Sequence, residues 1–288
     1  MACLAVEKGL HSNGRLRHSS RMKKNTEMPA TALKRTDETL DTVTFHGKEV
    51  SVCQKVKGYR FSLDSVLLAD FVRRLGRERV VDLGTGSGII ALLLAKRFPS
   101  TKVWAVELQP SLADMAHRNI MLNGLEDRMQ LVEADVAGLK KLGKIIEPGS
   151  IDRVVCNPPY RKSTTGLISP DDERAVARHE IRGGIDVMAK AARYLLKNGG
   201  FFNVIYLASR LSDLIDALRR EKLEPKRIRF IHSYRDSEAK MVMVEAKKEG
   251  GRDLKVLPPL YVYERGKDYS EEVLGIFGKV RPQIGIDQ

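Results

Sequence analysis

Residues 157–160 read Asn-Pro-Pro-Tyr, a short motif whose side chains and stiff backbone could act on an amine. Neither proline has a backbone N–H, and each restricts its own φ angle and the conformation of the residue before it. The turn therefore fixes the Asn157 side chain and the Pro158 carbonyl as a pair of hydrogen-bond acceptors. Tyr160 offers an aromatic face on which a flipped nucleobase can stack, a contact worth roughly 1–3 kcal/mol.

Such a pair of acceptors suits an exocyclic amine on an aromatic ring. The lone pair of that nitrogen is delocalised into the ring, so the amine is a poor nucleophile. Two acceptors that hold its N–H groups pull the nitrogen toward tetrahedral geometry and aim the lone pair at a methyl carbon. If the methyl donor is already activated, positioning supplies most of the acceleration, and no metal and no separate general base are required. The motif predicts methyl transfer to such an amine.

A glycine turn upstream predicts the methyl donor. Gly84, Gly86 and Gly88 alternate directly after a short apolar run that contains Asp82. Glycines permit a tight turn and let the backbone approach a ligand closely, but a dinucleotide fingerprint would read G-x-G-x-x-G. A carboxylate repels a pyrophosphate and attracts a sulfonium or an amino group. Asp82 therefore favours a cofactor without phosphates, namely S-adenosylmethionine.

Two further carboxylates follow predicted strands. Glu107 ends the second strand, 25 residues after Asp82, where it can accept hydrogen bonds from both ribose hydroxyls. Asp135 follows the third strand and could reach the adenine end of the cofactor. A lone Asp is more often a helix N-cap. Three carboxylates at corresponding strand ends instead favour a ligand crevice at the carboxyl edge of an open α/β sheet.

The elements that must position these residues alternate between strand and helix. Strands are predicted at 80–83, 102–107, 129–133, 151–156, 201–206, 227–232 and 241–247, and helices at 89–97, 112–122, 185–196 and 211–220. This alternation predicts a Rossmann-like α/β fold, with a mostly parallel seven-stranded sheet and helices on both faces. Little helix separates the last two strands, which predicts an antiparallel strand at the edge.

The chain before this core has a different pattern. Residues 42–54 alternate polar and apolar residues around His46-Gly47, which predicts a β-hairpin, and 62–74 predict a helix with Ser62 as its N-cap. The chain is accordingly divided into a disordered basic tail at 1–38, a hairpin and helix at 39–78, a catalytic core at 79–250 and a C-terminal extension at 251–288 with a helical stretch at 271–277.

The charge predicts a polyanionic partner. The formal net charge is +13, and residues 1–36 account for +6 of it with eight Lys/Arg and two Glu, so the rest of the chain carries +7. Clustered Lys and Arg gain affinity by releasing counterions from phosphates. Lys226, Arg227 and Arg229 form one basic cluster, which is either a solvated strand edge or a contact to the RNA backbone.

Several classes of protein are disfavoured. No apolar run approaches the roughly 20 residues that span a bilayer, and the first thirty residues do not resemble a secretory signal. Three cysteines without C-x-x-C spacing argue against a disulfide framework or a zinc site. We expect a cytoplasmic protein that binds no metal and is a monomer or a weak dimer.

The motifs together resemble those of class I amino-methyltransferases. Gln54, the run GYRFSLD at 58–64 and ARHE at 177–180 narrow the resemblance to the bacterial tRNA1(Val) (adenine-N6)-methyltransferase family, which modifies the adenosine beside the valine anticodon. The similarity runs from about Thr42 to Gly278 and includes LYVY at 260–263. It implies that Asn157, Pro158 and Tyr160 hold the adenine, and that the segment Tyr59–Asp64 closes over the methionine end of the cofactor.

The expected contacts follow from these patterns and from the resemblance. Cofactor contacts are expected at Tyr59, Asp64, Asp82, Gly84, Gly86, Gly88, Glu107, Leu108, Asp135 and Asn157. RNA contacts are expected at Arg178, His179, Lys226, Arg227 and Arg229. His179 is interpreted as a structural or substrate-positioning residue, since the chemistry does not need it as a base.

Two other functions stay open. Enzymes that methylate a glutamine of a translation release factor use the same tetrapeptide on the same core, and 182–186 (RGGID) faintly resembles a glycine motif in them. Those enzymes usually carry a helical N-terminal domain, whereas a short hairpin-like segment is predicted here. The chain could also be an RNA-binding protein on a retired methyltransferase fold, although intact Asp82, Glu107 and Asn157 argue against that.

Overall fold

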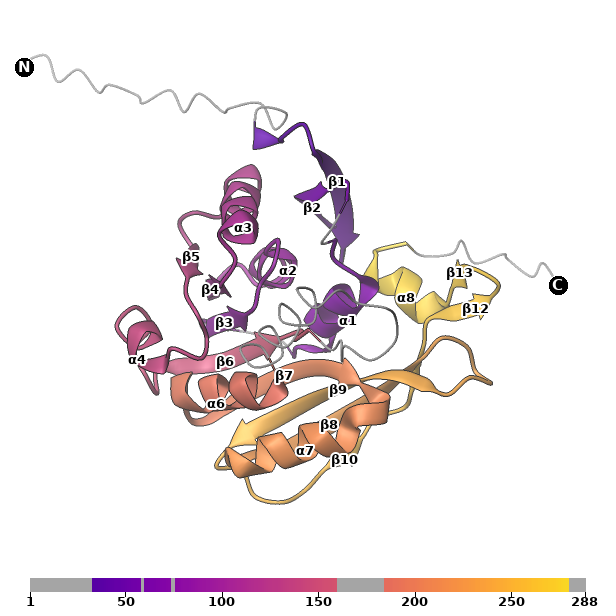
Figure 1. Ribbon diagram of the computed structural model, residues 1–288. Coiled ribbons are helices and arrows are strands. Elements are labelled where there is room, and N and C mark those ends of the chain that lie inside the picture. The colour runs from indigo at the N-terminus through magenta and orange to yellow at the C-terminus, as the bar shows by residue number, and fades with distance from the viewer. Residues whose placement is uncertain (1–32, 58–59, 74–75, 160–183, 280–288) are drawn as a thin grey trace, which may run out of the picture.

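The structure is a computed structural model, and it describes residues 33–57, 60–73, 76–159 and 184–279 (Figure 1). The site residues Tyr59, Tyr160, Arg178 and His179 lie outside the described residues, as does the tail up to residue 32.

The predicted hairpin is present and begins four residues earlier than expected. β1 (Glu38–Phe45) pairs antiparallel with β2 (Lys48–Lys55) across His46 and Gly47, whose φ angles are 47° and 73°. Two successive positive φ angles are typical of the tight turn whose twist matches paired strands. The early start has a physical cause, because the buried Glu38 carboxylate binds the Arg118 guanidinium at 2.6 Å.

The central sheet is mostly parallel, as predicted. Among the described residues it has nine strands in the spatial order β10-β8-β9-β7-β6-β3-β4-β5, with β11 also pairing with β8. β9 lies between β7 and β8 and runs antiparallel to both. The antiparallel pairing is therefore toward the β10 end of the sheet. The strands are β3 (Arg79–Leu83), β4 (Lys102–Glu107), β5 (Met129–Glu133), β6 (Ile151–Cys156), β7 (Leu196–Leu207), β8 (Leu223–His232), β9 (Ala239–Lys248), β10 (Lys255–Val256) and β11 (Leu260–Tyr261).

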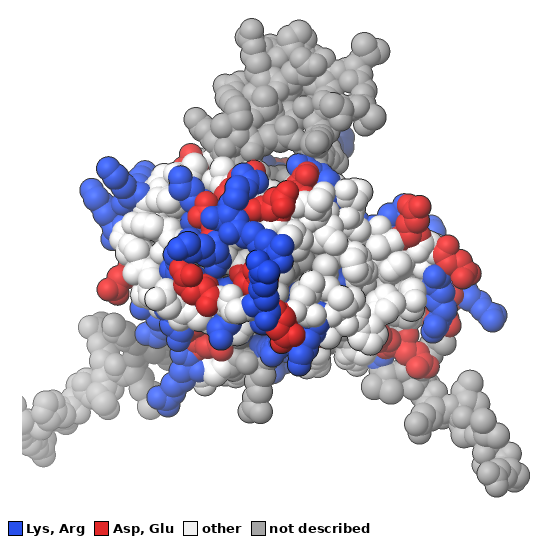
Figure 2. All heavy atoms as spheres, turned by 90° about the horizontal axis from the view of Figure 1, so that it is seen from below, with Lys and Arg blue, Asp and Glu red and all other residues white. Residues whose placement is uncertain are grey.

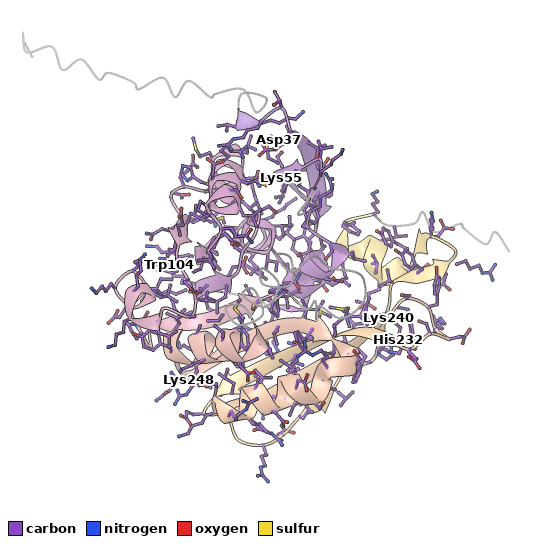
Figure 3. All side chains as sticks on the ribbon, viewed as in Figure 1. Asp37, Lys55, Trp104, His232, Lys240 and Lys248 are labelled. Atoms are coloured by element: carbon purple, nitrogen blue, oxygen red, sulfur yellow. The ribbon has the colours of Figure 1, made fainter. Side chains whose placement is uncertain are left out.

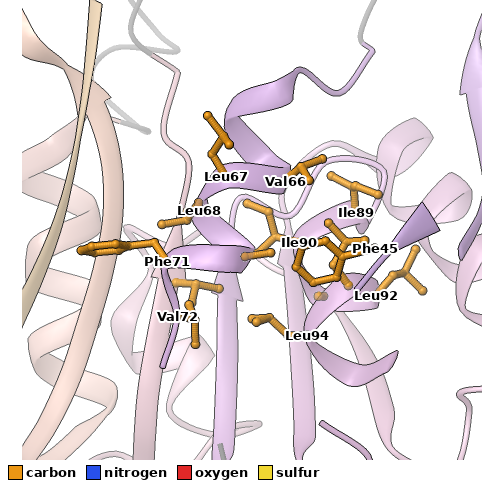
Figure 4. Packing of buried hydrophobic residues seen from close by; sticks show 14 of the residues in the cluster. Phe45, Val66, Leu67, Leu68, Phe71, Val72, Ile89, Ile90, Leu92 and Leu94 are labelled. Carbon is orange, nitrogen blue, oxygen red and sulfur yellow. The ribbon is translucent and has the colours of Figure 1, made fainter. Parts of the chain in front are cut away.

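Helices cover both faces of this sheet (Figure 1). One core contains residues of α1 (Leu63–Phe71), α2 (Ile89–Arg97) and α3 (Pro110–Leu122), and Figure 4 shows Phe45 of the hairpin packed among α1 and α2 side chains. The other core contains residues of α4 (Leu139–Leu142), α6 (Ile185–Leu195) and α7 (Leu211–Arg220). Val80 belongs to the first core and Val81 to the second, because successive strand residues point to opposite faces.

The junction of α6 and β7 differs from the prediction. The sequence predicts a helix up to residue 196 that is stopped by Asn198-Gly199-Gly200, but α6 ends at Leu195 and β7 starts at once. Lys248 explains this end, since its ammonium donates to the carbonyls of Arg193 (2.8 Å) and Leu196. Carbonyls at a helix end need such donors, and β9 supplies one here.

The C-terminal extension packs against the hairpin. After β11 it forms β12 (Tyr263–Arg265), β13 (Asp268–Tyr269) and α8 (Glu271–Ile276). The short helix η2 (Ala208–Arg210) lies earlier in the chain, between β7 and α7. Ser270 caps α8 by accepting the Val273 N–H at 3.3 Å. The Ile276 carbonyl accepts the His46 N–H at 2.9 Å, so the extension and the first hairpin are held together.

Candidate active site

The ends of neighbouring parallel strands bring Asp82, Glu107 and Asn157 to one edge of the sheet. β3 lies between β6 and β4, and Asp82 is in register with Val155 and Ala105. Glu107 is the last residue of β4, and Asn157 directly follows β6. Figure 3 marks the two ends of β9, which is separated from β6 by β7, with Lys240 near its start and Lys248 at its end. Because β9 is antiparallel, its start lies at the carboxyl edge that carries the site.

The glycine turn crosses from β3 toward β4. The φ angles of Gly84, Gly86 and Gly88 are 68°, 60° and 87°, a region that residues with a Cβ adopt only with strain. The backbone N–H groups of Gly84 and Thr85 both donate to the Val106 carbonyl at 2.9 Å. The turn therefore needs its glycines and is held against the end of β4.

The Glu107 carboxylate is fixed by backbone donors. It is 5% exposed, one oxygen accepts the N–H groups of Leu108 and Gln109, and the other accepts the Gly86 N–H, all at 2.9 Å. Leu108 is 36% exposed beside it. A carboxylate has about four lone-pair sites, and three accept these N–H groups, so Glu107 can still accept one hydrogen bond from a ligand such as a ribose.

The Asp135 carboxylate has a different local environment from that of Glu107. It follows β5, and its Oδ1 accepts the Ala137 N–H at 2.9 Å. A bond of this kind, to an N–H two residues on, is an Asx turn. Asp135 is thus a turn residue at the predicted edge, and its contact with a cofactor stays a prediction.

Asp82 is the most buried charged residue of the site. It is 0% exposed, and one carboxylate oxygen accepts the Thr85 hydroxyl at 2.5 Å. Burial raises the pKa of Asp82 to about 7, the negative charge of Glu107 adds to the rise, and the Thr85 hydrogen bond opposes it. Asp82 Oδ1 and Ser87 Oγ are buried without a hydrogen-bond partner in the described part of the chain. Two unpaired acceptors beside a glycine turn fit a ligand with cationic or N–H groups.

The raised pKa of Asp82 predicts a pH-dependent stability of the protein without ligand. The folded state holds the Asp82 proton up to about pH 7, whereas an unfolded Asp releases it near pH 3.8. Because the folded state binds more protons in that window, the contribution of Asp82 to stability falls as the pH rises through it. We expect the free energy of unfolding of wild type, measured against Asp82→Asn, to fall by about 2 kcal/mol between pH 5.5 and 8. Urea titrations of both proteins at the two pH values measure this, and an unchanged difference would contradict the assignment.

The Asn157 side chain is held from α1. Its Nδ2 donates to the Ser65 hydroxyl at 3.2 Å. Asn157 is half-buried, Pro158 is buried and Pro159 is exposed. The turn after β6 thus carries the Asn157 amide and the Pro158 backbone at the same edge as the glycine turn. Ser65 was not predicted as a site residue.

Asp64, on the first turn of α1, is half-buried, and its carboxylate accepts the Ser62 hydroxyl at 2.9 Å. Ser62 is the N-cap residue of α1 by position, but its side chain makes no capping hydrogen bond to the backbone. The hydroxyl that was predicted to cap the helix is directed to Asp64 instead.

Asn119 is a second residue that the sequence reasoning missed. It is fully buried on α3, exchanges two hydrogen bonds with the backbone of Cys53 in β2 (2.7 and 3.1 Å), and donates to the Ser87 carbonyl at 2.9 Å. Asn123, one turn later, makes the same paired contact with Ser51. The available signal was Asn119 on the predicted helix at 112–122, followed by Asn123 one turn later, just after that helix. They fasten the hairpin to α3, and Asn119 also fastens it to the glycine turn.

The predicted basic cluster on β8 makes contacts within the protein. Arg227 lies 4.4 Å above the Phe71 ring and pairs with Glu245 at 3.4 Å, and burial lowers its pKa. Arg229 binds Glu272 at 2.7 Å, and the Lys226 ammonium donates to the Gly251 carbonyl at 3.0 Å. These cations hold β8 to its neighbours, and their contact with RNA stays a prediction.

Figure 2 shows the face around α7 and β10, where Lys and Arg side chains are interspersed with Asp and Glu side chains. Ion pairs account for part of this mixture. Arg219 pairs with Glu224 at 3.4 Å, and Arg220 pairs with Asp186 at 3.0 Å.

Metal sites and membrane-spanning helices are both absent from the described residues. No group of three or more His, Cys, Asp or Glu side chains in that part of the chain could hold a metal ion. Within the same residues, no helix is both long enough and apolar enough to cross a membrane.

The sheet order, the glycine turn and the acidic strand ends define a Rossmann-like methyltransferase. Among solved structures, a predicted O-methyltransferase from Agrobacterium tumefaciens has the same fold, with a TM-score of 0.61 at 21% identity over 76% of this chain and 98% of that one. A T. thermophilus 16S rRNA N2 G1207 methyltransferase, solved with AdoMet and guanosine, matches with a TM-score of 0.52 at 18% identity over 74% of this chain and 51% of that one.

Sequence comparisons place the chain in a narrower group than the fold does. Residues 60–222 match the model of the methyltransferase small domain family. A tRNA1(Val) (adenine(37)-N6)-methyltransferase from Porphyromonas gingivalis is 30% identical over 210 residues, which cover 72% of this chain and 81% of that protein. The chain belongs to the methyltransferase small domain family and, within it, to the tRNA1(Val) (adenine(37)-N6)-methyltransferases.

Proposed function

We propose that the protein transfers a methyl group from S-adenosylmethionine to the exocyclic N6 amine of an adenosine in tRNA, the adenosine 3′ of the anticodon of tRNA-Val. The observation that carries this proposal is the position of Asn157 and Pro158. They follow β6, the strand next to the one that ends in the glycine turn, so an amine acceptor site and a cofactor site share one edge. The family supports the tRNA substrate.

The residues at that edge fit S-adenosylmethionine, which supplies an electrophilic methyl group on a sulfonium when bound. Glu107 would accept a hydrogen bond from a ribose hydroxyl. The backbone of the turn from Gly84 to Gly88 would lie directly against the ligand. Asp82, with an unpaired buried oxygen among the described residues, would face its cationic end. Leu108 and Asp135 are proposed contacts at its adenine end.

Asn157 and Pro158 are proposed to orient the target amine. The Asn157 side-chain oxygen accepts one N6–H, and the Pro158 carbonyl accepts the other. The lone pair on the nitrogen then points toward the methyl carbon, forms the new N–C bond as the S–C bond breaks, and the displaced proton leaves to water. Positioning of this kind accounts for most of the rate, since the methyl group is already activated.

The remaining parts of the proposal concern RNA. The overall charge of +13 favours a polyanionic substrate. Arg178 and His179, together with Lys226, Arg227 and Arg229 on β8, are the proposed RNA contacts. Tyr160 is proposed as the stacking face for the flipped adenine. We further propose that the enzyme acts in the cytoplasm as a monomer or weak dimer.

A competition experiment separates this function from glutamine methylation. Purified protein with methyl-labelled S-adenosylmethionine is offered an unmodified tRNA-Val transcript and a translation release factor in the same reaction. We expect label in the RNA and none in the protein. Label in the release factor would overturn the proposed function, and label in neither would favour a non-enzymatic RNA-binding protein. A second transcript with guanosine in place of the target adenosine is the matched control and is expected to stay unlabelled.

A further inference from the structure

One buried hydroxyl on α1, the helix that precedes β3 and the glycine turn, reaches the catalytic motif. Ser65 lies in the first turn of α1, is 2% exposed, and its Oγ accepts the Asn157 Nδ2–H at 3.2 Å. α1 precedes the first strand of the core, so this contact joins two parts of the chain that are 92 residues apart.

The contact matters because an Asn side chain is not symmetric. Its amide group carries one acceptor oxygen and one NH₂ donor of nearly the same shape, and a half-turn of the group exchanges them. With Nδ2 directed to Ser65, Oδ1 lies on the other side of the amide group, away from α1. In the reverse orientation a donor would meet the N–H groups of the target amine, and the amine could not be held.

We propose that Ser65 is a positioning residue that anchors the Asn157 amide group from α1, so that its acceptor oxygen stays directed to the N–H of the target amine. This inference rests on the proposed function and deepens it, because it assigns the N-terminal helix a part in catalysis. Ser65 touches neither substrate nor cofactor in this proposal and acts only through Asn157.

The Ser65→Ala variant tests the proposal. Without the hydroxyl the Asn157 amide group loses its anchor on α1, and we expect the single-turnover rate with unmodified tRNA to fall about three- to tenfold, as for the loss of one neutral hydrogen bond. Cofactor affinity by calorimetry and tRNA affinity are expected to stay at wild-type values, so the effect is on the rate and not on binding.

A double-mutant cycle separates positioning from a general structural effect. If Ser65 acts through Asn157, Ser65→Ala has no further effect on the rate in the Asn157→Ala background. Ser270→Ala is the matched control. Ser270 is nearly buried, as Ser65 is, and makes two side-chain hydrogen bonds. It lies in the C-terminal extension, where it caps α8. We expect it to lower the melting temperature at least as much as Ser65→Ala while leaving the rate unchanged.

A spectroscopic readout is independent of activity. The side-chain NH₂ signals of Asn157 can be assigned by their absence in Asn157→Ala, and they are expected to shift in Ser65→Ala but not in Ser270→Ala. The positioning role would be overturned if Ser65→Ala methylated tRNA at the wild-type rate. It would also be overturned if Ser65→Ala caused the same rate loss in the wild-type protein and in the Asn157→Ala variant. Either result would leave the proposed function intact. A wild-type protein that methylates no tRNA would overturn the proposed function itself.

Discussion

Asn157→Ala is expected to lower the single-turnover rate of tRNA methylation about 10²- to 10³-fold. The variant removes one preorganised polar group aimed at the reacting amine, a loss that typically costs about 2.7–4 kcal/mol in the transition state. Asn157 is half-buried at the end of β6, so the sheet and the glycine turn are expected to keep their structure. The measurement is methyl transfer to an unmodified tRNA with enzyme in excess, at saturating cofactor.

Asn123→Ala is the matched control for this experiment. Asn123 also uses its amide group in hydrogen bonds, but to the backbone of Ser51 on the hairpin. We expect this variant to lose stability and to keep the methylation rate. Asn157→Asp provides an intermediate case, because a carboxylate still accepts a hydrogen bond but adds charge, and its rate is expected above that of the alanine variant. A wild-type rate in Asn157→Ala would contradict the role of the motif.

Glu245→Ala is expected to lower the free energy of unfolding by about 3–5 kcal/mol. Glu245 is fully buried on β9 and pairs with Arg153 at 3.1 Å, with Arg73 at 3.1 Å and with Arg227 at 3.4 Å. Arg153 is itself buried on β6 and would keep Glu78, at 3.3 Å, as a carboxylate partner, but a buried guanidinium that loses one of its carboxylates is strongly unfavourable. Chemical denaturation monitored by circular dichroism measures the loss.

Glu249→Ala is the matched control on the same segment. Its carboxylate pairs with Arg193 at 2.7 Å, but its side chain is 42% exposed, and exposed pairs contribute at most about 1 kcal/mol. We expect a small change in stability. Equal effects of the two variants would show that the buried network on β9 does not stabilise the fold in the way proposed.

The elements of the core were predictable because their signals are local. α2 and β4 begin and end at the predicted residues. An apolar run directly after the glycine turn indicates α2, and a short apolar run indicates β4. Neither signal depends on the rest of the chain. The shared edge of Asp82, Glu107 and Asn157 was also predictable. Carboxyl ends of parallel strands meet at one edge, so their placement follows from the strand order alone.

The contacts that were missed depend on residues far apart in the sequence. Lys248 ends α6 from 55 residues away, and Asn119 reaches the glycine turn and a strand that is 66 residues away. Arg227 looked like an exposed basic residue because its partner Glu245 stands on the neighbouring strand. Alternation of residue types predicts which face a side chain takes, but it does not predict the partner found there.

The identity of the methylated atom tests the central claim most directly. Unmodified tRNA-Val is incubated with wild-type protein and S-adenosylmethionine, digested to nucleosides and analysed by mass spectrometry against authentic standards, with fragment mapping of the modified position. We expect N6-methyladenosine at the adenosine 3′ of the anticodon. A methyl group on a ring nitrogen, on carbon or on another base would contradict a mechanism in which Asn157 and Pro158 hold an exocyclic adenine amine.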